Sequence, residues 1–131
     1  MPSTRFRQRL AAILAADAAG YSRLMAADEP ATVEALDAAR AVFRRQIEAL
    51  EGRVIDMAGD SVLAIFDLAS AATAAARAIQ EEMDAAPREG PEERRMRFRI
   101  GIHLGEIIEK PDGTVYGDGV NVAARSPGLG E

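Results

Sequence analysis

Hydrophobic residues change their spacing repeatedly along this chain, and the order of these patterns constrains the fold more than any other feature. Residues 10–16 form a short apolar run that ends before Gly20. The length of the run and the glycine favour a buried strand, while its alanines leave a helix as the alternative. Apolar residues at three- and four-residue steps over 31–51 predict an amphipathic helix that begins near Glu29-Pro30 and ends at Gly52.

A hairpin, a second helix and another strand are predicted next. Residues 53–57 and 62–66 are two β-rich runs separated by residues 58–61, which is typical of a β-hairpin. The second run is apolar on both faces, as expected for a central strand. Residues 69–83 predict an alanine-rich helix, whose small inner side chains would let it lie close to a sheet. Strict alternation of apolar and polar residues over 96–104 predicts a further strand.

The remainder of the chain is predicted to form a turn and a short helix. Residues 111–113 indicate the turn, and residues 119–125 a helix that ends before Pro127, because proline disfavours helical geometry at the preceding residue. The complete order is β-α-β-β-α-β, which is the split βαβ or ferredoxin-like arrangement. We therefore expect one α+β domain over residues 1–131, with an antiparallel sheet and helices on one face.

Composition excludes several kinds of chemistry. The chain has 131 residues, no cysteine and a single histidine, His103. Thiolate zinc sites, cysteine nucleophiles and multi-histidine metal centres are therefore excluded. The net charge of −5 argues against nucleic acid as the main partner. No segment approaches the ~18 apolar residues of a membrane span. Arg5, Arg7 and Arg9 before the first apolar run imitate a signal peptide, but the run is short, so we expect a cytoplasmic domain.

Two aspartates are candidates for metal binding. Asp17 follows the first strand, and Asp60 lies in the predicted hairpin turn. In a ferredoxin-like sheet this strand and this hairpin are neighbours, so both carboxylates can converge on one edge. Such a pair suits Mg²⁺ or Mn²⁺, and Mg²⁺ takes one or two carboxylates together with substrate phosphates. The alternative is structural, with Asp17 capping the following helix and Asp60 serving as an ordinary turn residue.

Two further sets of residues are candidates for contacts with a phosphorylated ligand. The residues between the first strand and its helix can turn backbone N–H groups toward a phosphate; they are Ala18, Ala19, Gly20 and Tyr21. Asn121 and Arg125 lie one turn apart on the predicted C-terminal helix. Arginine presents a planar fork of donors to phosphate, and asparagine can donate to or accept from a sugar oxygen. The alternative for this pair is a solvated helix end.

The strand at 96–104 carries the histidine and several arginines. His103 lies on the face opposite Phe98 and Ile102, and we expect a hydrogen-bonded structural residue rather than a catalyst. The basic stripe is expected to be a solvated strand edge offset by neighbouring glutamates. It consists of Arg94, Arg95, Arg97 and Arg99.

Four blocks of the sequence, in order, resemble the catalytic domain of the bacterial class III adenylate and guanylate cyclases. The blocks are LAAILAADAAGYSRLM at residues 10–25, RVIDMAGDSVLAIF at 53–66, FRIGIHLGEI at 98–107 and VYGDGVNVAAR at 115–125. The resemblance covers residues 8–125 and leaves 126–131 as a divergent tail. It implies an enzyme that converts ATP to 3′,5′-cyclic AMP and pyrophosphate in signal transduction.

The resemblance also implies roles for the candidate residues. Asp17 and Asp60 would hold two Mg²⁺ or Mn²⁺ ions, which activate the ribose 3′-hydroxyl and bind the phosphates. Asn121 would orient the ribose, and Arg125 would neutralise charge on the α-phosphate. In the family the two pairs come from opposite subunits, so a homodimer is implied.

Two positions differ from the family pattern in a way that bears on the choice of base. The purine-selecting position that is lysine in many adenylate cyclases corresponds to Asp56, and its partner position corresponds to Thr114. An ionised aspartate only accepts hydrogen bonds, so Asp56 cannot donate to adenine N1 as lysine would. It can accept from guanine or from the exocyclic amine of adenine, so both ATP and GTP remain candidates.

The C-terminal end also departs from the family pattern. The family domain continues beyond the Asn/Arg helix with further strands and a phosphate-contacting lysine, whereas here no lysine follows Lys110. The resemblance therefore implies a C-terminally truncated domain that lacks the last strands. Loss of an ordered phosphate-binding cation typically costs ~3–4 kcal/mol of transition-state stabilisation. The alternative to a weakly active cyclase is a degenerate module that dimerises or binds nucleotide without turnover.

Overall fold

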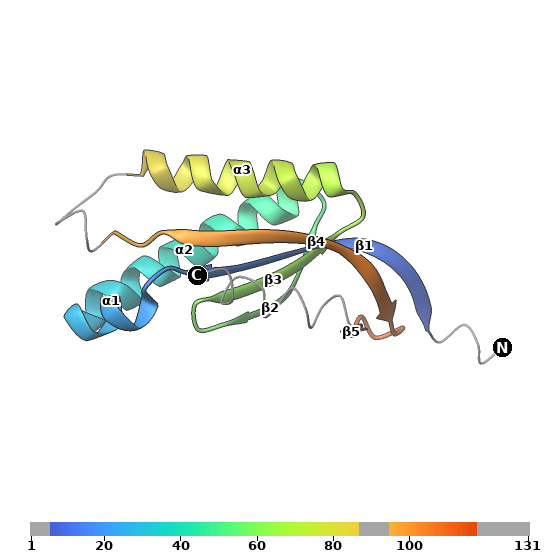
Figure 1. Cartoon of the computed structure of the whole chain (residues 1–131), viewed down its shortest axis with the longest axis horizontal. Helices are drawn as coiled ribbons and strands as arrows, with labels where there is room; N and C mark the ends of the chain where they lie inside the picture. Colours follow the sequence, from blue (N-terminus) through green and yellow to red (C-terminus); the bar gives the residue numbers. More distant parts are fainter. Residues whose placement is uncertain (1–5, 87–94, 118–131) are drawn as a thin grey trace.

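Helices α2 (Glu29–Ala49) and α3 (Ala69–Ala85) cover one face of an antiparallel sheet in the computed structural model, which describes residues 6–86 and 95–117 (Figure 1). The short helix α1 (Tyr21–Ala27) lies at the end of the sheet against α2. The strands are β1 (Arg7–Ala18), β2 (Arg53–Ala58), β3 (Ser61–Phe66), β4 (Phe98–Glu109) and β5 (Val115–Tyr116). The strand order β2-β3-β1-β4-β5 contains the order of the split βαβ arrangement, so the predicted fold class is confirmed.

The predicted long helix is confirmed, and a short helix precedes it that the sequence did not predict. Gly20 adopts a left-handed φ of 63° at the start of α1, a conformation that glycine takes at little cost. Asp28 then ends α1, and its side chain accepts a hydrogen bond from the backbone N–H of Ala31 at 3.1 Å to cap α2. Pro30 in the first turn of α2 completes this start signal.

Two hydrophobic clusters lie on the two sides of the sheet. The larger one packs α2 and α3 on the sheet and includes Phe43, whose ring lies 4.9 Å from that of Phe98. Ala72 and Ala75 of α3 are fully buried there, as expected for a helix close to the sheet. The smaller cluster comes from strands alone, and we call its side the helix-free face. Its buried members are Ala11, Ile13, Ala15, Ile65, Ile107 and Val115.

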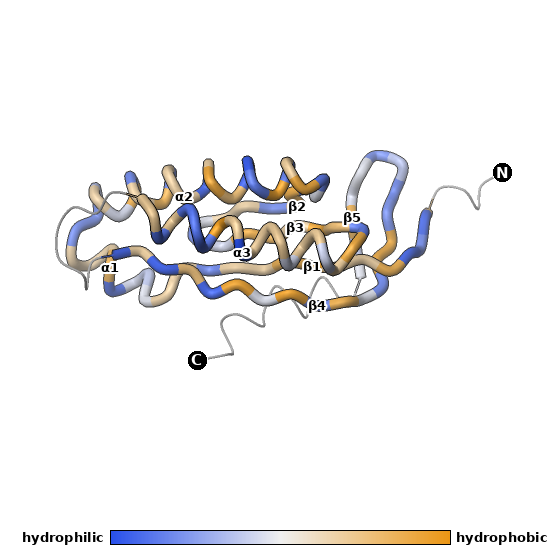
Figure 2. Tube along the Cα trace, turned by 90° about the horizontal axis from the view of Figure 1, so that it is seen from above, coloured by the Kyte–Doolittle hydropathy of each residue, from blue (hydrophilic) through white to orange (hydrophobic). Residues whose placement is uncertain are grey.

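Strand β4 changes its buried face along its length. Near its start Phe98 is buried under the helices, whereas near its end Ile107 is buried in the smaller cluster. Beyond this point the strand bends away from α3 toward β5 (Figure 1). Figure 2 shows the β4–β5 hairpin projecting from the end of the sheet toward the side of β2. In the described parts of the chain, no helix is long and apolar enough to cross a membrane.

Candidate functional site

A cavity on the helix-free face brings two of the predicted site residues together. It has a volume of about 190 Å³. Its lining includes the carboxylate residues Asp17 and Asp56 together with Ala15, Ser61 and Leu63. Sheet register explains this meeting, because Ala15 pairs with Leu63 and Leu63 pairs with Asp56. Side chains of paired residues point to the same face of a sheet.

A β-bulge in β2 turns Asp56 toward this face. The pairing runs regularly from Arg53 to Val54 and then shifts, so that Asp56 rather than Ile55 is opposite Leu63. Without the extra residue, Asp56 would be opposite Val62, which is buried under the helices. Bulges often re-aim a side chain next to a functional site. Here the bulge puts a carboxylate on the helix-free face.

Asp17 is held by an arginine of the neighbouring strand. The Nε of Arg99 donates to Oδ1 of Asp17 at 3.0 Å, and Nη2 donates to Oδ2 at 3.1 Å. The two residues are register partners across β1 and β4, and their side chains are 19% (Asp17) and 30% (Arg99) exposed. The structural alternative in which Asp17 caps α1 is wrong, because the N-cap is Gly20. The solvated stripe predicted for this strand is also wrong at Arg99.

Asp60 reaches the same end of β1 from the hairpin turn. Its Oδ2 accepts a hydrogen bond from the backbone N–H of Ala18, the residue after Asp17, at 3.1 Å. Both carboxylates therefore lie at one rim of the sheet. No three His, Cys, Asp or Glu side chains group around a metal position within residues 6–86 and 95–117. The donor set fits a hard divalent cation that takes its other ligands from phosphate and water oxygens.

The backbone N–H groups of residues 18–21 are only partly available to a ligand. That of Ala18 donates to Asp60, and that of Ala19 donates to the carbonyl oxygen of Arg97 at 2.8 Å. Two amides of the segment predicted to turn N–H groups toward a phosphate are therefore engaged within the protein, and phosphate binding by this segment stays a prediction. The reason is that β1 continues to Ala18, so its last amides are used by neighbouring strands and turns. Gly20 and Tyr21 complete the predicted segment, and the Tyr21 side chain packs against the larger hydrophobic cluster.

Thr114, the predicted partner of Asp56, lies in the β4–β5 hairpin and is not among the residues that line the cavity of Asp17 and Asp56. Its backbone N–H donates to Oδ1 of Asp112 at 2.9 Å, and its carbonyl oxygen accepts from the N–H of Lys110 at 2.9 Å. Asn121 and Arg125, the predicted ribose and α-phosphate contacts, lie outside the described residues, as does the predicted helix at 119–125.

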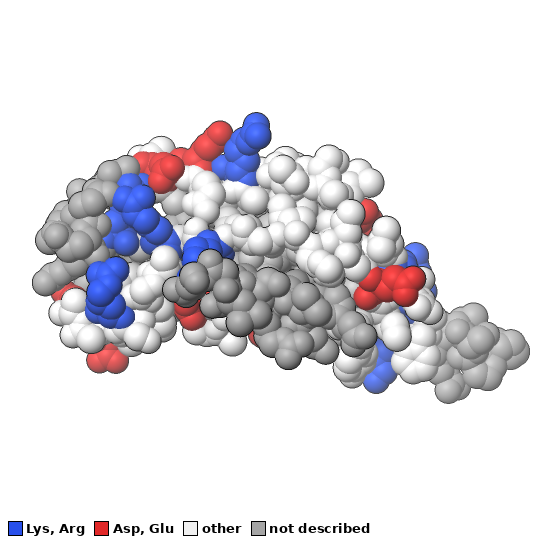
Figure 3. Space-filling model, viewed as in Figure 1, with Lys and Arg blue, Asp and Glu red and all other residues white. Residues whose placement is uncertain are grey.

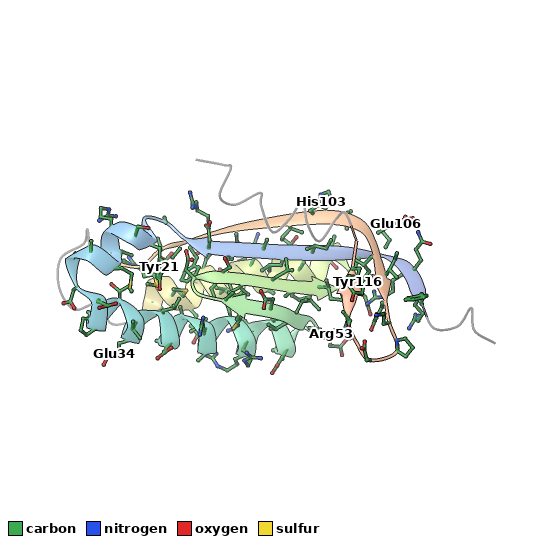
Figure 4. The ribbon with its side chains drawn as sticks, turned by 90° about the horizontal axis from the view of Figure 1, so that it is seen from below. Tyr21, Glu34, Arg53, His103, Glu106 and Tyr116 are labelled. Carbon is green, nitrogen blue, oxygen red and sulfur yellow. The ribbon has the colours of Figure 1, made fainter. Side chains whose placement is uncertain are left out.

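His103 is exposed on β4, and Figure 4 shows it at the outer side of that strand. Within the described residues its ring makes no hydrogen bond that would support the predicted structural role. Figure 3 shows basic side chains gathered at the end of the molecule where α1 lies and β4 begins.

Sequence reasoning assigned no role in the site to two arginines of the helix-free face, and it placed Arg99 only in a solvated basic stripe. Arg99 shares the alternation of β4 with His103 and Gly101, and this signal places it on the face of Asp17 once the strand register is known. Arg53 begins β2, and its guanidinium contacts the β4–β5 hairpin. No local sequence pattern indicates that second contact.

The fold is that of the catalytic domain of a class III nucleotide cyclase. The sequence model of the family described as the adenylate and guanylate cyclase catalytic domain matches residues 6–131. The chain therefore belongs to the adenylate and guanylate cyclase family.

Two relatives illustrate this membership, and a more distant solved structure shares the fold. The chain is 46% identical over 132 residues to "Putative adenylate cyclase 3" of Rhizobium meliloti (strain 1021). That match covers 100% of this chain and 22% of the relative, so the chain spans about a fifth of the curated protein. The adenylate/guanylate cyclase/hydrolase from Silicibacter pomeroyi is 40% identical with a TM-score of 0.82, covering 96% of this chain and 73% of that one. The adenylyl cyclase CyaB from P. aeruginosa has a TM-score of 0.77 at 19% identity, covering 96% and 74%, which shows a shared fold alone.

Proposed function

We propose that this domain converts ATP to 3′,5′-cyclic AMP and pyrophosphate in cyclic-nucleotide signalling, with GTP as the other candidate substrate. Membership of the family supports the reaction class, and the name of the Rhizobium relative supports ATP. The observation that carries the proposal is the meeting of Asp17 and Asp60 at one rim, linked through the N–H of Ala18.

The proposed chemistry joins the ribose 3′-oxygen to the α-phosphorus and releases pyrophosphate. Asp17 and Asp60 would hold two Mg²⁺ or Mn²⁺ ions, which supply activation of the attacking hydroxyl and charge neutralisation at the phosphates. Asn121 orients the ribose in this proposal, and Arg125 offsets the charge that develops on the α-phosphate. Asp56 accepts a hydrogen bond from the base, because an ionised carboxylate offers acceptors only.

The complete site is proposed to form in a homodimer. Asp17 and Asp60 of one copy would face Asn121 and Arg125 of the second, as the family resemblance implies. The partners in this proposal are therefore the nucleotide and a second copy of the chain, with no nucleic acid involved. Cytoplasmic localisation is part of the proposal, because the nucleoside triphosphate is made there.

An assay with purified protein, Mn²⁺ and either ATP or GTP tests the proposal. The wild-type chain is expected to form cyclic product, and Asp17→Ala is expected to form none. The matched control is Asp37→Ala, which removes an exposed aspartate of α2. Activity that survives Asp17→Ala would refute the assignment of the metal ligands, and loss of activity in Asp37→Ala would point to general damage instead.

One observation favours a non-catalytic module as the second candidate. Both oxygens of Asp17 already accept hydrogen bonds from Arg99, so a cation must compete for or share this carboxylate. Nucleotide binding by calorimetry with no product after long incubation would favour this candidate, and any cyclic product above the Asp17→Ala background would exclude it.

A further inference from the structure

The β4–β5 hairpin is fastened across the helix-free face by apolar and polar contacts. Ile107 and Val115, on its two arms, are 0% and 9% exposed and pack in the cluster formed with β1 and β3. Within residues 95–117 the two arms pair at Ile108 with Tyr116 and at Glu109 with Val115. Side-chain contacts with the rest of the sheet add to this pairing in fixing the position of the hairpin.

Arg53 supplies the polar connection from β2. Its Nη1 donates to Oε2 of Glu109 at 3.0 Å, and its Nη2 donates to the carbonyl oxygen of Gly113 at 3.3 Å. A guanidinium presents its donors in a rigid fork, so one side chain holds both the arm and the turn of the hairpin. Figure 4 shows Arg53 beside the hairpin strand that carries Tyr116.

Glu109 is the centre of this connection. Its other oxygen, Oε1, accepts from Nη2 of Arg9 at 3.4 Å, and Arg9 also contacts Asp67 at 2.7 Å. The Glu109 side chain is only 19% exposed. The hydrogen bond from Arg53 is the main reason that the pKa of Glu109 lies below its usual value, so the group is ionised and accepts from both arginines. We call Arg53, Glu109 and Arg9 the hairpin latch.

The latch connects the two residues that correspond to base-selecting positions. Arg53 lies on β2, the strand of Asp56, and its contact at Gly113 is next to Thr114. Resting on the proposed function, we propose that Arg53 is a positioning residue for recognition of the nucleotide base. It holds the hairpin that carries Thr114 in a fixed place relative to the strand that carries Asp56.

The metal end of the site lies away from the latch. Ile13 of β1 is opposite Ile65, which pairs with Arg53, and Ile13 is four residues from Asp17. At about 3.3 Å per residue this is roughly 13 Å along the strand. Removal of the latch is therefore expected to weaken recognition of the nucleotide base and to leave Mn²⁺ binding at Asp17 and Asp60 unchanged.

Substitution of Arg53 in the full 131-residue chain tests the proposal. Arg53→Gln is expected to raise the nucleotide KM about fivefold, the equivalent of ~1 kcal/mol for a partly exposed ion pair, while kcat changes less than about twofold. The ratio of kcat/KM for ATP over GTP should move toward one. Amide hydrogen exchange over residues 107–116 should become faster, and Mn²⁺ affinity without nucleotide should stay the same. Arg53→Lys, which keeps the charge but loses the fork, should recover part of the base preference.

Two other variants separate positioning from a general structural role. Glu109→Gln removes the same contact from the hairpin side and is expected to give the same loss of base preference, with no further loss in the double variant. Arg45→Gln is the matched control, because Arg45 also forms an ion pair and is similarly exposed, but it lies on α2 and pairs with Glu82 of α3. It should change stability without changing base preference.

The outcomes distinguish this proposal from the proposed function. Suppose that the wild type discriminates between ATP and GTP. If Arg53→Gln then speeds amide hydrogen exchange in the hairpin without altering KM or the preference between the nucleotides, the latch is structural only and the positioning role is overturned. If the wild type makes no product, dissociation constants for fluorescent ATP and GTP analogues replace KM as the readout. If the wild type binds neither analogue, the proposed function fails and this inference fails with it.

Discussion

The guanidinium of Arg99 donates a hydrogen bond to each carboxylate oxygen of Asp17, although the two residues are 82 positions apart in the sequence. The contact follows directly from the register of β1 and β4, which places the two residues opposite each other. It gives the proposed metal ligand a cationic partner that belongs to the protein. Arg99 therefore competes with any divalent cation that binds Asp17.

Replacing Arg99 should strengthen the binding of Mn²⁺ in the absence of nucleotide. The attraction between two unit charges about 4 Å apart is ~1 kcal/mol in a water-like dielectric, so a cation that displaces Arg99 from Asp17 loses about this much, which corresponds to about fivefold in affinity. We expect Arg99→Gln to lower the dissociation constant for Mn²⁺ by about that factor, measured by electron paramagnetic resonance of the free ion.

Arg95→Gln provides the control for the Arg99 prediction, because Arg95 pairs with Asp84 and not with a proposed metal ligand. It should leave the Mn²⁺ affinity unchanged. Weaker Mn²⁺ binding in Arg99→Gln would show that Arg99 orients Asp17 for the cation, which is the opposite of competition.

Local patterns predicted the elements and their topology because each element buries a periodic face. The helix at 31–51, the hairpin runs and the helix at 69–83 all correspond to observed elements with small shifts at their ends. The neighbourhood of Asp17 and Asp60 also followed from topology, since β1 and β3 pair as the split βαβ order requires. No observation tests their binding of metal, and this remains a prediction.

Features that depend on register or on a change of face were not predictable. The alternation of β4 stops being regular at Gly105, and the predicted strand ended at Leu104, whereas the observed strand continues to Glu109. The physical reason is that its buried side switches from the helices to the helix-free face, where Ile107 is fully buried. The bulge that redirects Asp56 and the pairing of Arg99 likewise depend on partners distant in sequence.

Gly52 should be intolerant of even a methyl group. It lies between α2 and β2, where its N–H donates to the carbonyl oxygen of Ile47 at 2.8 Å. An added Cβ would lie 2.5 Å from Cε2 of Phe66, a ring that is 2% exposed. Because this ring has no room to move, we expect Gly52→Ala to lower the free energy of unfolding by about 1–3 kcal/mol, measured by urea denaturation.

Gly101→Ala is the matched substitution for Gly52→Ala. A Cβ on Gly101 meets nothing within 4 Å, so the free energy of unfolding should stay within about 0.5 kcal/mol of the wild type or rise slightly. Equal destabilisation by the two substitutions would contradict the packing described around Phe66.

The ion pair between α2 and α3 should make stability depend on pH in the acid range. Arg45 donates to both carboxylate oxygens of Glu82 at 2.8 and 2.5 Å, and Gln46 adds a third hydrogen bond at 2.8 Å. These bonds, with that from Arg45 the largest contribution, lower the pKa of Glu82 from 4.5 to about 2. Between these two values the unfolded chain binds more protons than the folded one, so protonation favours unfolding. The contribution of Glu82 is therefore complete above pH 4.5 and is lost as the pH falls toward 2.

Glu82→Gln should be less stable than the wild type at pH 6 and equal to it near pH 2, measured by urea unfolding across this range. Glu81→Gln, an exposed neighbour on α3, serves as the control and should keep the full acid dependence. A pH profile of Glu82→Gln parallel to that of the wild type from pH 6 to 2 would show that this pair does not couple the two helices.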